Sequence, residues 1–182
     1  MKRVFDISIG GEGYKMTYTL RTFRAVSDQF GSPDKMMEAM NADSALEAVE
    51  AQIFVLHQLI LAGARLSTMY GEEAKTITLE KTRATSGLIQ IAKLKDTLIA
   101  VIAAASKPSI EAMPAAKKKT TRRGISVFEH YLWQGLHIGL DYNTALDIPF
   151  GELLSLIGEE AIQNGAKERI RNSQADVIPD WD

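Results

Sequence analysis

Residues 44–66 read SALEAVEAQIFVLHQLILAGARL, and this stretch decides the fold of the chain. Ser44 and Glu47 have the spacing of a capping box, in which each side chain accepts a hydrogen bond from the backbone N–H of the other residue. Apolar residues then recur at helical spacing, at Leu46, Val49, Ile53, Leu56, Ile60 and Ala64. The stretch therefore predicts a long amphipathic helix from about Ala45 to Leu66, at the centre of an N-terminal core.

A different periodicity precedes this helix. Apolar residues alternate with polar ones around Ile7 and again around Tyr18, and the glycine-rich run 10–13 lies between the two segments. Alternation on both sides of a glycine turn is typical of a β-hairpin. The period then becomes helical at Phe23. The sequence therefore predicts a hairpin that leads into helices.

The remaining segments also have the pattern of helices. Ser32 and Pro33 mark the start of a short helix, and Ser126 with Glu129 forms a second capping box. Pro149 precedes a last apolar helix. The predicted fold class is mainly α with a small N-terminal β-hairpin, an α+β arrangement.

Charge divides the chain into three parts. Residues 1–116 carry 13 basic and 13 acidic groups, residues 117–123 carry five basic groups, and residues 124–182 carry 3 basic and 10 acidic groups. The apolar period also disappears between 103 and 124, where two prolines occur. We therefore expect a helical domain at 1–105, a flexible basic linker at 106–124 and a small acidic helical domain at 125–182.

Composition limits the classes of function. The chain has 182 residues, of which 46% are hydrophobic, so it can bury a core. It has no cysteine, which excludes disulfides and thiolate metal sites. His57 and Gln58 interrupt its richest apolar stretch, so we expect no membrane segment of about 18 residues. No signal peptide is expected either, and the predicted location is the cytoplasm.

Short motifs that could carry catalysis are incomplete. Gly11-x-Gly13 lacks the third glycine of a dinucleotide site, and Ser32-x-x-Lys35 lacks the partner motifs of a serine acylase. Asp141-x-Asn143 opens like a calcium loop without its later ligands, and a helix C-terminal turn is the preferred interpretation. We therefore expect no enzyme activity and no cofactor.

Histidines and basic residues give equally weak signals. His130 and His137 are seven residues apart, about 10 Å along a helix, which is too far for one metal ion. The cluster Lys117–Arg123 could bind phosphates, but no aromatic residues are interleaved with it. We therefore expect no metal site, and a solvated linker is preferred to a nucleic-acid site.

A methionine cluster is a candidate partner-binding surface. Met36, Met37 and Met40 lie on one side of the short helix that starts at Pro33. Methionine side chains adapt to varied apolar partners, and they also fill gaps in protein cores. Both interpretations remain open from the sequence.

Three stretches together resemble one family of proteins. They are the hairpin-to-helix opening from Val4 to Ser32, the long helix that ends in LILAGAR at 59–65, and the segment LDIPFGELLSLI at 146–157. Their order and spacing resemble tail assembly chaperones of long-tailed bacteriophages and the gene-transfer-agent relatives of these chaperones. The resemblance covers both ends of the chain and most of its middle.

The resemblance implies a function and two partners. In this family an N-terminal domain self-associates and coats the tape measure protein, while a downstream extension recruits tail tube subunits. The extension is often reached by ribosomal frameshifting on an A-rich run, and Lys117–Lys119 is where such a run would be encoded here. Direct gene fusion is the other possibility. A location in the host cytoplasm, and absence from the mature virion, are implied as well.

The helix near Pro149 is the expected site of tube recruitment. Phe150 and Leu154 are four residues apart and share a face, and Leu153 with Ile157 forms an adjacent pair. One pair could pack inward while the other contacts a partner, or both pairs could hold the small domain together. The alternative functions are a structural tail-completion or virion component and a helical nucleic-acid-binding regulator.

Overall fold

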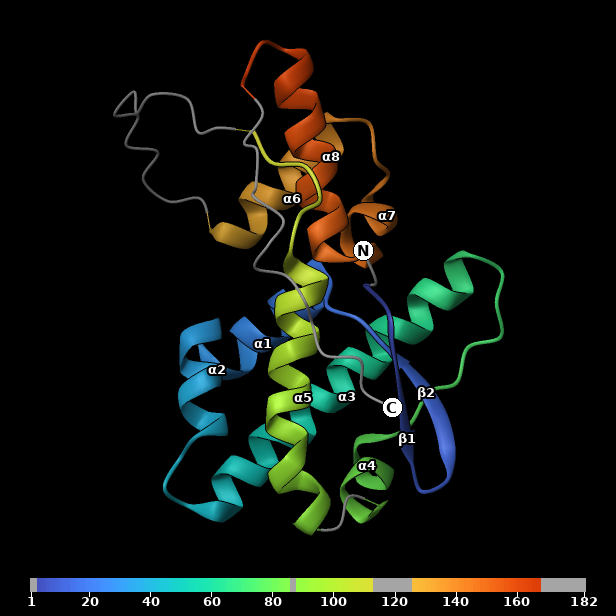
Figure 1. The fold of residues 1–182 in the computed structure, drawn as a ribbon, viewed down its shortest axis with the longest axis vertical. Helices are drawn as coiled ribbons and strands as arrows, with labels where there is room; N and C mark the ends of the chain where they lie inside the picture. The colour runs from blue at the N-terminus through green and yellow to red at the C-terminus, as the bar shows by residue number, and fades with distance from the viewer. Residues whose placement is uncertain (1–2, 86–87, 113–125, 168–182) are drawn as a thin grey trace, which may run out of the picture.

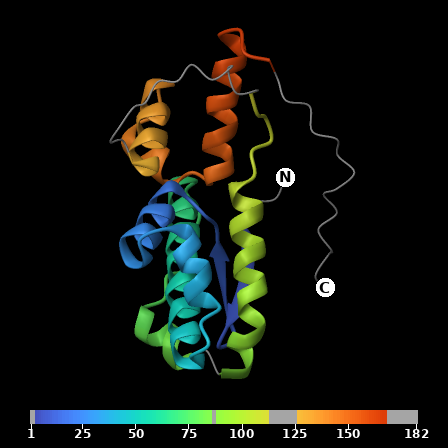
Figure 2. The same ribbon diagram turned by 90° about the vertical axis from the view of Figure 1, so that its left-hand side faces the viewer.

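The computed structural model describes residues 3–85, 88–112 and 126–167, and it shows helices in two tiers. The lower tier contains the hairpin and the helices of the N-terminal half, and the upper tier contains the last helices (Figures 1 and 2). The elements are β1 (Phe5–Ile9), β2 (Glu12–Met16), α1 (Leu20–Phe30), α2 (Pro33–Met40), α3 (Ala45–Met69), α4 (Leu79–Thr85), α5 (Leu88–Ser106), α6 (Val127–His137), α7 (Tyr142–Asp147) and α8 (Phe150–Gln163). The predicted fold class, mainly helical with an N-terminal hairpin, is confirmed.

The hairpin lies directly on the central helix. Its strands pair antiparallel, with Phe5 opposite Met16 and Ile9 opposite Glu12. Beyond β2, the Thr17 N–H donates to the Leu59 carbonyl of α3 at 3.2 Å. This close approach is possible because Gly63 has no side chain: a Cβ there would be 2.1 Å from the Lys15 carbonyl oxygen.

Serine caps begin three helices at the predicted residues, but only one of the two bonds predicted for the capping box at Ser44 is present. Ser32 Oγ accepts from the Lys35 N–H, and Ser44 Oγ accepts from the Glu47 N–H. At Ser126 both bonds of the capping box are present. Caps of this kind stabilise a helix by about 1 kcal/mol each, because they satisfy donors that have no partner within the helix.

Helix α3 is the central helix of the core, as predicted. The beginning of its predicted apolar face is not buried in the core. Ile53, Leu56 and Ile60 are buried, whereas Leu46 is 71% exposed and Val49 is only partly buried. Contrary to the expectation from His57 and Gln58, an 18-residue window of α3 is long and apolar enough to cross a membrane, with a mean hydropathy of 1.4, although length and composition alone also fit the core helix of a folded domain. Within the fold, α3 contacts β2, α1, α2, α4, α5 and α7, and buried Gln52 donates to the Met40 carbonyl.

The upper tier joins the same hydrophobic core. Leu146, Ile148, Phe150 and Leu153 belong to one cluster with buried residues of the hairpin, α1, α3 and α5. The Phe150 N–H donates to the Tyr18 carbonyl at 2.8 Å. Helices α6, α7 and α8 are thus packed on the N-terminal helices, and the independent folding of 1–105 stays a prediction.

The predicted flexible linker is described only at its beginning. Residues 107–112 lie along α8, where Gly151 and Gly158 allow close backbone contact with Lys107 and Ile110. The Ser109 N–H donates to Ser155 Oγ at 2.8 Å. The described part of this segment is therefore packed, and the rest, including the basic cluster at 117–123, lies outside the described residues.

Candidate partner-binding site

The methionine cluster lies mostly inside the protein. Met36 and Met40 are 2% and 1% exposed, and Met37 is partly buried against the same core. Helix α2 turns this side toward α1 and α3. In this structure the cluster therefore fills the core, which is the second of its two predicted roles, and Met36 and Met40 are not accessible to a partner.

The predicted recruiting helix is likewise turned inward. Leu153 is fully buried, Phe150 is 9% exposed, and Leu154 and Ile157 are partly buried against the core. The Phe150 ring packs against three aromatic rings. The distance between ring centroids is 5.2 Å for Tyr131, 6.1 Å for Phe23 and 6.3 Å for Tyr18. Both pairs on this helix therefore hold α8 to the protein, as the simpler alternative in the sequence predicts.

A partly buried arginine, Arg3, ties the segment before the hairpin to α8. Arg3 Nη2 donates to Ser109 Oγ at 2.8 Å, to Ser155 Oγ at 3.1 Å and to the Lys107 carbonyl at 3.4 Å. Its carbonyl accepts from the Thr17 hydroxyl at 2.8 Å. A charged group in so many bonds rigidifies its surroundings. The hairpin, the end of α5 and α8 are held together at this point.

Exposed apolar residues gather instead on α6 and the start of α7. Among the described residues seven large hydrophobic side chains are exposed, and four of them lie between residues 127 and 142: Val127, Trp133, Leu136 and Tyr142, at 56%, 54%, 42% and 50%. Trp133 stacks on the His137 ring, with centroids 5.1 Å apart. We call Trp133, Leu136 and His137 the outer face of α6.

The buried side of α6 explains why this outer face is rigid. Phe128, Tyr131 and Leu132 pack against the core, and the Arg24 guanidinium of α1 lies 5.0 Å from the centre of the Phe128 ring. Gly135 is buried, and a Cβ there would be 3.0 Å from the Ala145 side chain of α7. Helix α6 therefore presents its tryptophan on a fixed backbone.

The outer face of α6 has a signal in the sequence, which is the spacing of Trp133 and His137. Leu136, three residues after Trp133, is exposed as well. Trp133 and His137 are four residues apart and so share a face. An exposed tryptophan on a polar helix face is typical of contact surfaces, in which tryptophan is enriched.

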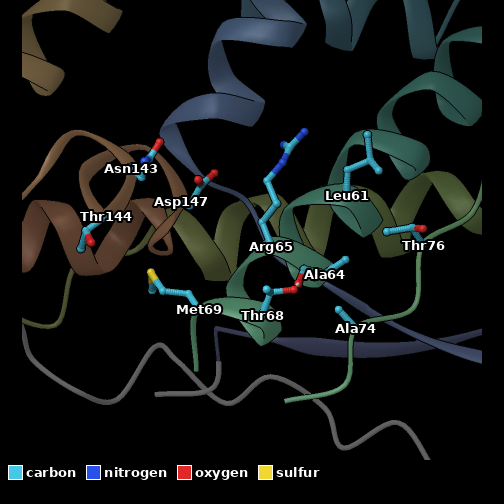
Figure 3. A pocket seen from close by; sticks show the side chains of 10 residues that line it. All are labelled: Leu61, Ala64, Arg65, Thr68, Met69, Ala74, Thr76, Asn143, Thr144 and Asp147. Atoms are coloured by element: carbon cyan, nitrogen blue, oxygen red, sulfur yellow. Dashed lines mark hydrogen bonds between the residues drawn. The ribbon is translucent and has the colours of Figure 1, made fainter. Parts of the chain in front are cut away.

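A cleft opens between the two tiers on another side of the molecule (Figure 3). It follows the last turns of α3, with α7 on one side and residues 74–76 on the other. Its volume is about 650 Å³. It is lined by Leu61, Ala64, Arg65, Thr68, Met69, Ala74, Thr76, Asn143, Thr144 and Asp147.

One side of the cleft is fixed by an ion pair between the tiers. Arg21 Nε and Nη2 of α1 donate to the two Asp147 carboxylate oxygens, each at 2.7 Å. Two parallel bonds of this kind fix both side chains in orientation. The bond to Asp147 raises the pKa of Arg21. Arg21 therefore neutralises the negative charge of Asp147, which lines the cleft.

Helix α7 begins differently from the sequence interpretation. Asp141 was interpreted as part of a helix C-terminal turn, whereas its carboxylate accepts from the backbone N–H groups of Asn143 and Thr144. Asp141 is thus the N-cap of α7, and the Thr144 hydroxyl and these N–H groups lower its carboxyl pKa. The cap holds Asn143 and Thr144 at the cleft.

His57 lies on α3, one turn before the cleft residue Leu61, and its titration tests the structure of this region. Burial lowers the pKa of His57 below its ordinary value, and the nearby positive charge of Arg65 lowers it further, although a hydrogen bond with the Ile77 backbone opposes the shift. The folded protein therefore binds the His57 proton less strongly than the unfolded chain, whose histidine titrates near 6.5. Stability is retained above that pH, and the His57 contribution is lost as the pH falls below it.

We therefore expect an NMR titration of the His57 ring to have its midpoint below about 6.5. Replacing Arg65 with glutamine should raise that midpoint, because a positive charge is removed. A midpoint at or above 6.5 in the unaltered chain would contradict the placement of His57 in a partly desolvated position.

Comparisons with known proteins add no family to these observations. No family model, curated protein or solved structure matches the chain. Within the described ranges, 3–85, 88–112 and 126–167, no group of three or more His, Asp and Glu side chains could hold a metal ion.

Proposed function

We propose that this chain is a tail assembly chaperone of a long-tailed bacteriophage, without enzymatic activity. It would keep the tape measure protein soluble, recruit tail tube subunits and act as an oligomer in the host cytoplasm. The order of the three stretches at 4–32, 59–65 and 146–157 supports this proposal, because it resembles that of the family.

The observation that carries the proposal is the outer face of α6. A chaperone needs an apolar surface that is accessible before its partner binds, and exposed apolar patches mark contact sites. Trp133 and Leu136 provide such a surface on a helix whose other side is anchored in the core. Recruitment of the tube subunit is therefore assigned to α6 in place of α8.

Charge gives the recruiting segment a second property. Residues 124–182 carry an excess of seven acidic groups over basic ones. Charge of one sign around an apolar contact accelerates encounter with an oppositely charged partner, and salt weakens this effect. We expect the tube subunit to present basic residues around an apolar patch.

Replacing Trp133 and Leu136 together with serine should abolish capture of the tail tube protein by the full chain. Both side chains are about half exposed, so the fold should remain intact, with a loss of stability of about 0.5 kcal/mol or less per site. Loss of a central tryptophan from an interface weakens binding by about 2 kcal/mol or more, roughly thirtyfold. Co-purification from co-expressing cells measures the capture.

Leu46→Ser is the matched control, because Leu46 is 71% exposed on α3, away from α6. It should capture the tube protein like the unaltered chain. The tape measure protein should stay soluble with the α6 variant, since its binding is assigned to residues 1–105. Equal capture by the α6 variant would refute the recruiting surface, and finding the chain in purified virions would favour a structural tail component.

A further inference from the structure

We propose that the cleft between α3, residues 74–76 and α7 binds a short acidic peptide segment of a partner, with a glutamate or aspartate side chain flanked by apolar residues. This site is separate from the outer face of α6, and the inference does not depend on which protein that face recruits.

The cation in the cleft, Arg65, has no ion-pair or hydrogen-bond partner for its guanidinium among the residues that the structure describes. Arg65 is the one cationic side chain among the described residues that line it, and it is exposed. The ion pairs and side-chain hydrogen bonds among the described residues do not include its guanidinium. Figure 3 shows this side chain extending from α3, with Asn143 and Asp147 on its α7 side. Its five N–H donors are therefore available to a carboxylate.

The acidic residue in the cleft does not compensate Arg65. The Asp147 carboxylate already accepts two hydrogen bonds from Arg21, and its side chain is only 13% exposed. Arg21 thus neutralises Asp147, and Arg65 adds a net positive charge to the lining. An incoming carboxylate meets one uncompensated guanidinium, and the side-chain amide of Asn143 belongs to the α7 side of the same lining.

The rest of the lining suits apolar neighbours of that carboxylate. Leu61, Ala64 and Ala74 form part of the wall, and Met69 at the end of α3 is 40% exposed. A volume of about 650 Å³ lies within the range of about 300–1,000 Å³ found for ligand pockets. The methionine side chain can adapt to different apolar groups.

The same features argue against a polyanion. Nucleic acids are bound through several cations, each of which neutralises a phosphate. Here a single cation lies among neutral side chains and a paired carboxylate. A single acidic side chain with apolar flanks matches this arrangement better than a row of phosphates.

NMR titration of the isotopically labelled full chain tests this site. The probes are acetyl-Leu-Glu-Leu-amide and acetyl-Leu-Gln-Leu-amide, which differ only in the central charge. We expect the glutamate peptide to shift the Arg65 Nε–H and Asn143 side-chain amide signals saturably. The glutamine peptide should bind about tenfold more weakly or worse, as for a lost charged hydrogen bond.

Arg65→Gln should weaken binding of the glutamate peptide by a similar factor. Arg83→Gln is the matched control, because it removes one exposed guanidinium that pairs with Glu50 outside the cleft, and it should bind normally. The serine variant of Trp133 and Leu136 should also bind normally, which separates this site from the tube-binding surface.

Several outcomes would overturn the proposal. The first two are equal affinity for the two peptides and normal binding of the glutamate peptide by Arg65→Gln. A third is the absence of any shift at the Arg65 Nε–H signal. The last is binding of isovalerate as tight as that of the glutamate peptide, which would indicate a small carboxylate in place of a peptide.

Discussion

Replacing Phe150 with alanine should lower the free energy of unfolding of the whole described fold by about 3–5 kcal/mol. The ring is 9% exposed and contacts Tyr18, Phe23 and Tyr131, so its removal leaves a cavity between the two tiers. Edge-on and stacked aromatic contacts add to the apolar area that is lost. Urea unfolding, followed by circular dichroism, measures the change.

Trp133→Ala is the control for this variant, because it also removes a large aromatic group but from an exposed position. Its effect should be about 0.5 kcal/mol or less. A single shared core predicts one unfolding transition that shifts as a whole in Phe150→Ala. Two transitions, of which only one shifts, would instead support a separately folding domain at 1–105.

Replacing Gly63 with alanine should destabilise the protein by about 3 kcal/mol, at the upper end of the range for overpacking. The added Cβ would be 2.1 Å from the Lys15 carbonyl oxygen and 2.9 Å from the Met16 nitrogen. These are backbone atoms of β2, so the hairpin would have to move away from α3 as a unit. Urea unfolding and hydrogen exchange at the Thr17 amide measure the two consequences.

The direction of the change in stability distinguishes a close contact at Gly63 from free space there. Alanine is favoured over glycine by about 1 kcal/mol inside a helix, so Gly63→Ala would stabilise a helix with free space at this position. Gly13→Ala in β2 is the control, because nothing lies within 4 Å of an added Cβ. Any stabilisation by Gly63→Ala would show that the hairpin does not contact α3 in this way.

Local signals in the sequence were sufficient for the hairpin turn and for the starts of α2 and α6, but not for the start of α7, where Asp141 is the N-cap. The Ser126 capping box, the Ser32 cap with Pro33 and the glycine turn at Gly10 and Gly11 each involve residues that are neighbours along the chain. Their geometry depends on hydrogen bonds over two to four residues, so it can be read without knowing the tertiary fold.

The partner surface could not be read in the same way, because it depends on contacts between distant segments. Met36 and Phe150 have the same apolar character as Trp133, and only the packing of α2 and α8 against the core decides that they are inside. Arg65 and Asn143 lie 78 positions apart and meet at one cleft. The spacing of residues within a single helix cannot indicate that two distant segments of the chain line the same cleft.

The hydrogen bonds of Arg3 have a consequence for synthesis on the ribosome. Two of its acceptors, the Ser109 hydroxyl and the Lys107 carbonyl, leave the ribosome about a hundred residues after Arg3, and the third, Ser155, leaves later still. Until α8 emerges, the aromatic rings of Tyr18 and Phe23 lack their cover. Native structure around Arg3 is therefore completed only after α8 has been synthesised, and a nascent chain stalled near residue 120 would expose apolar surface that the folded protein buries.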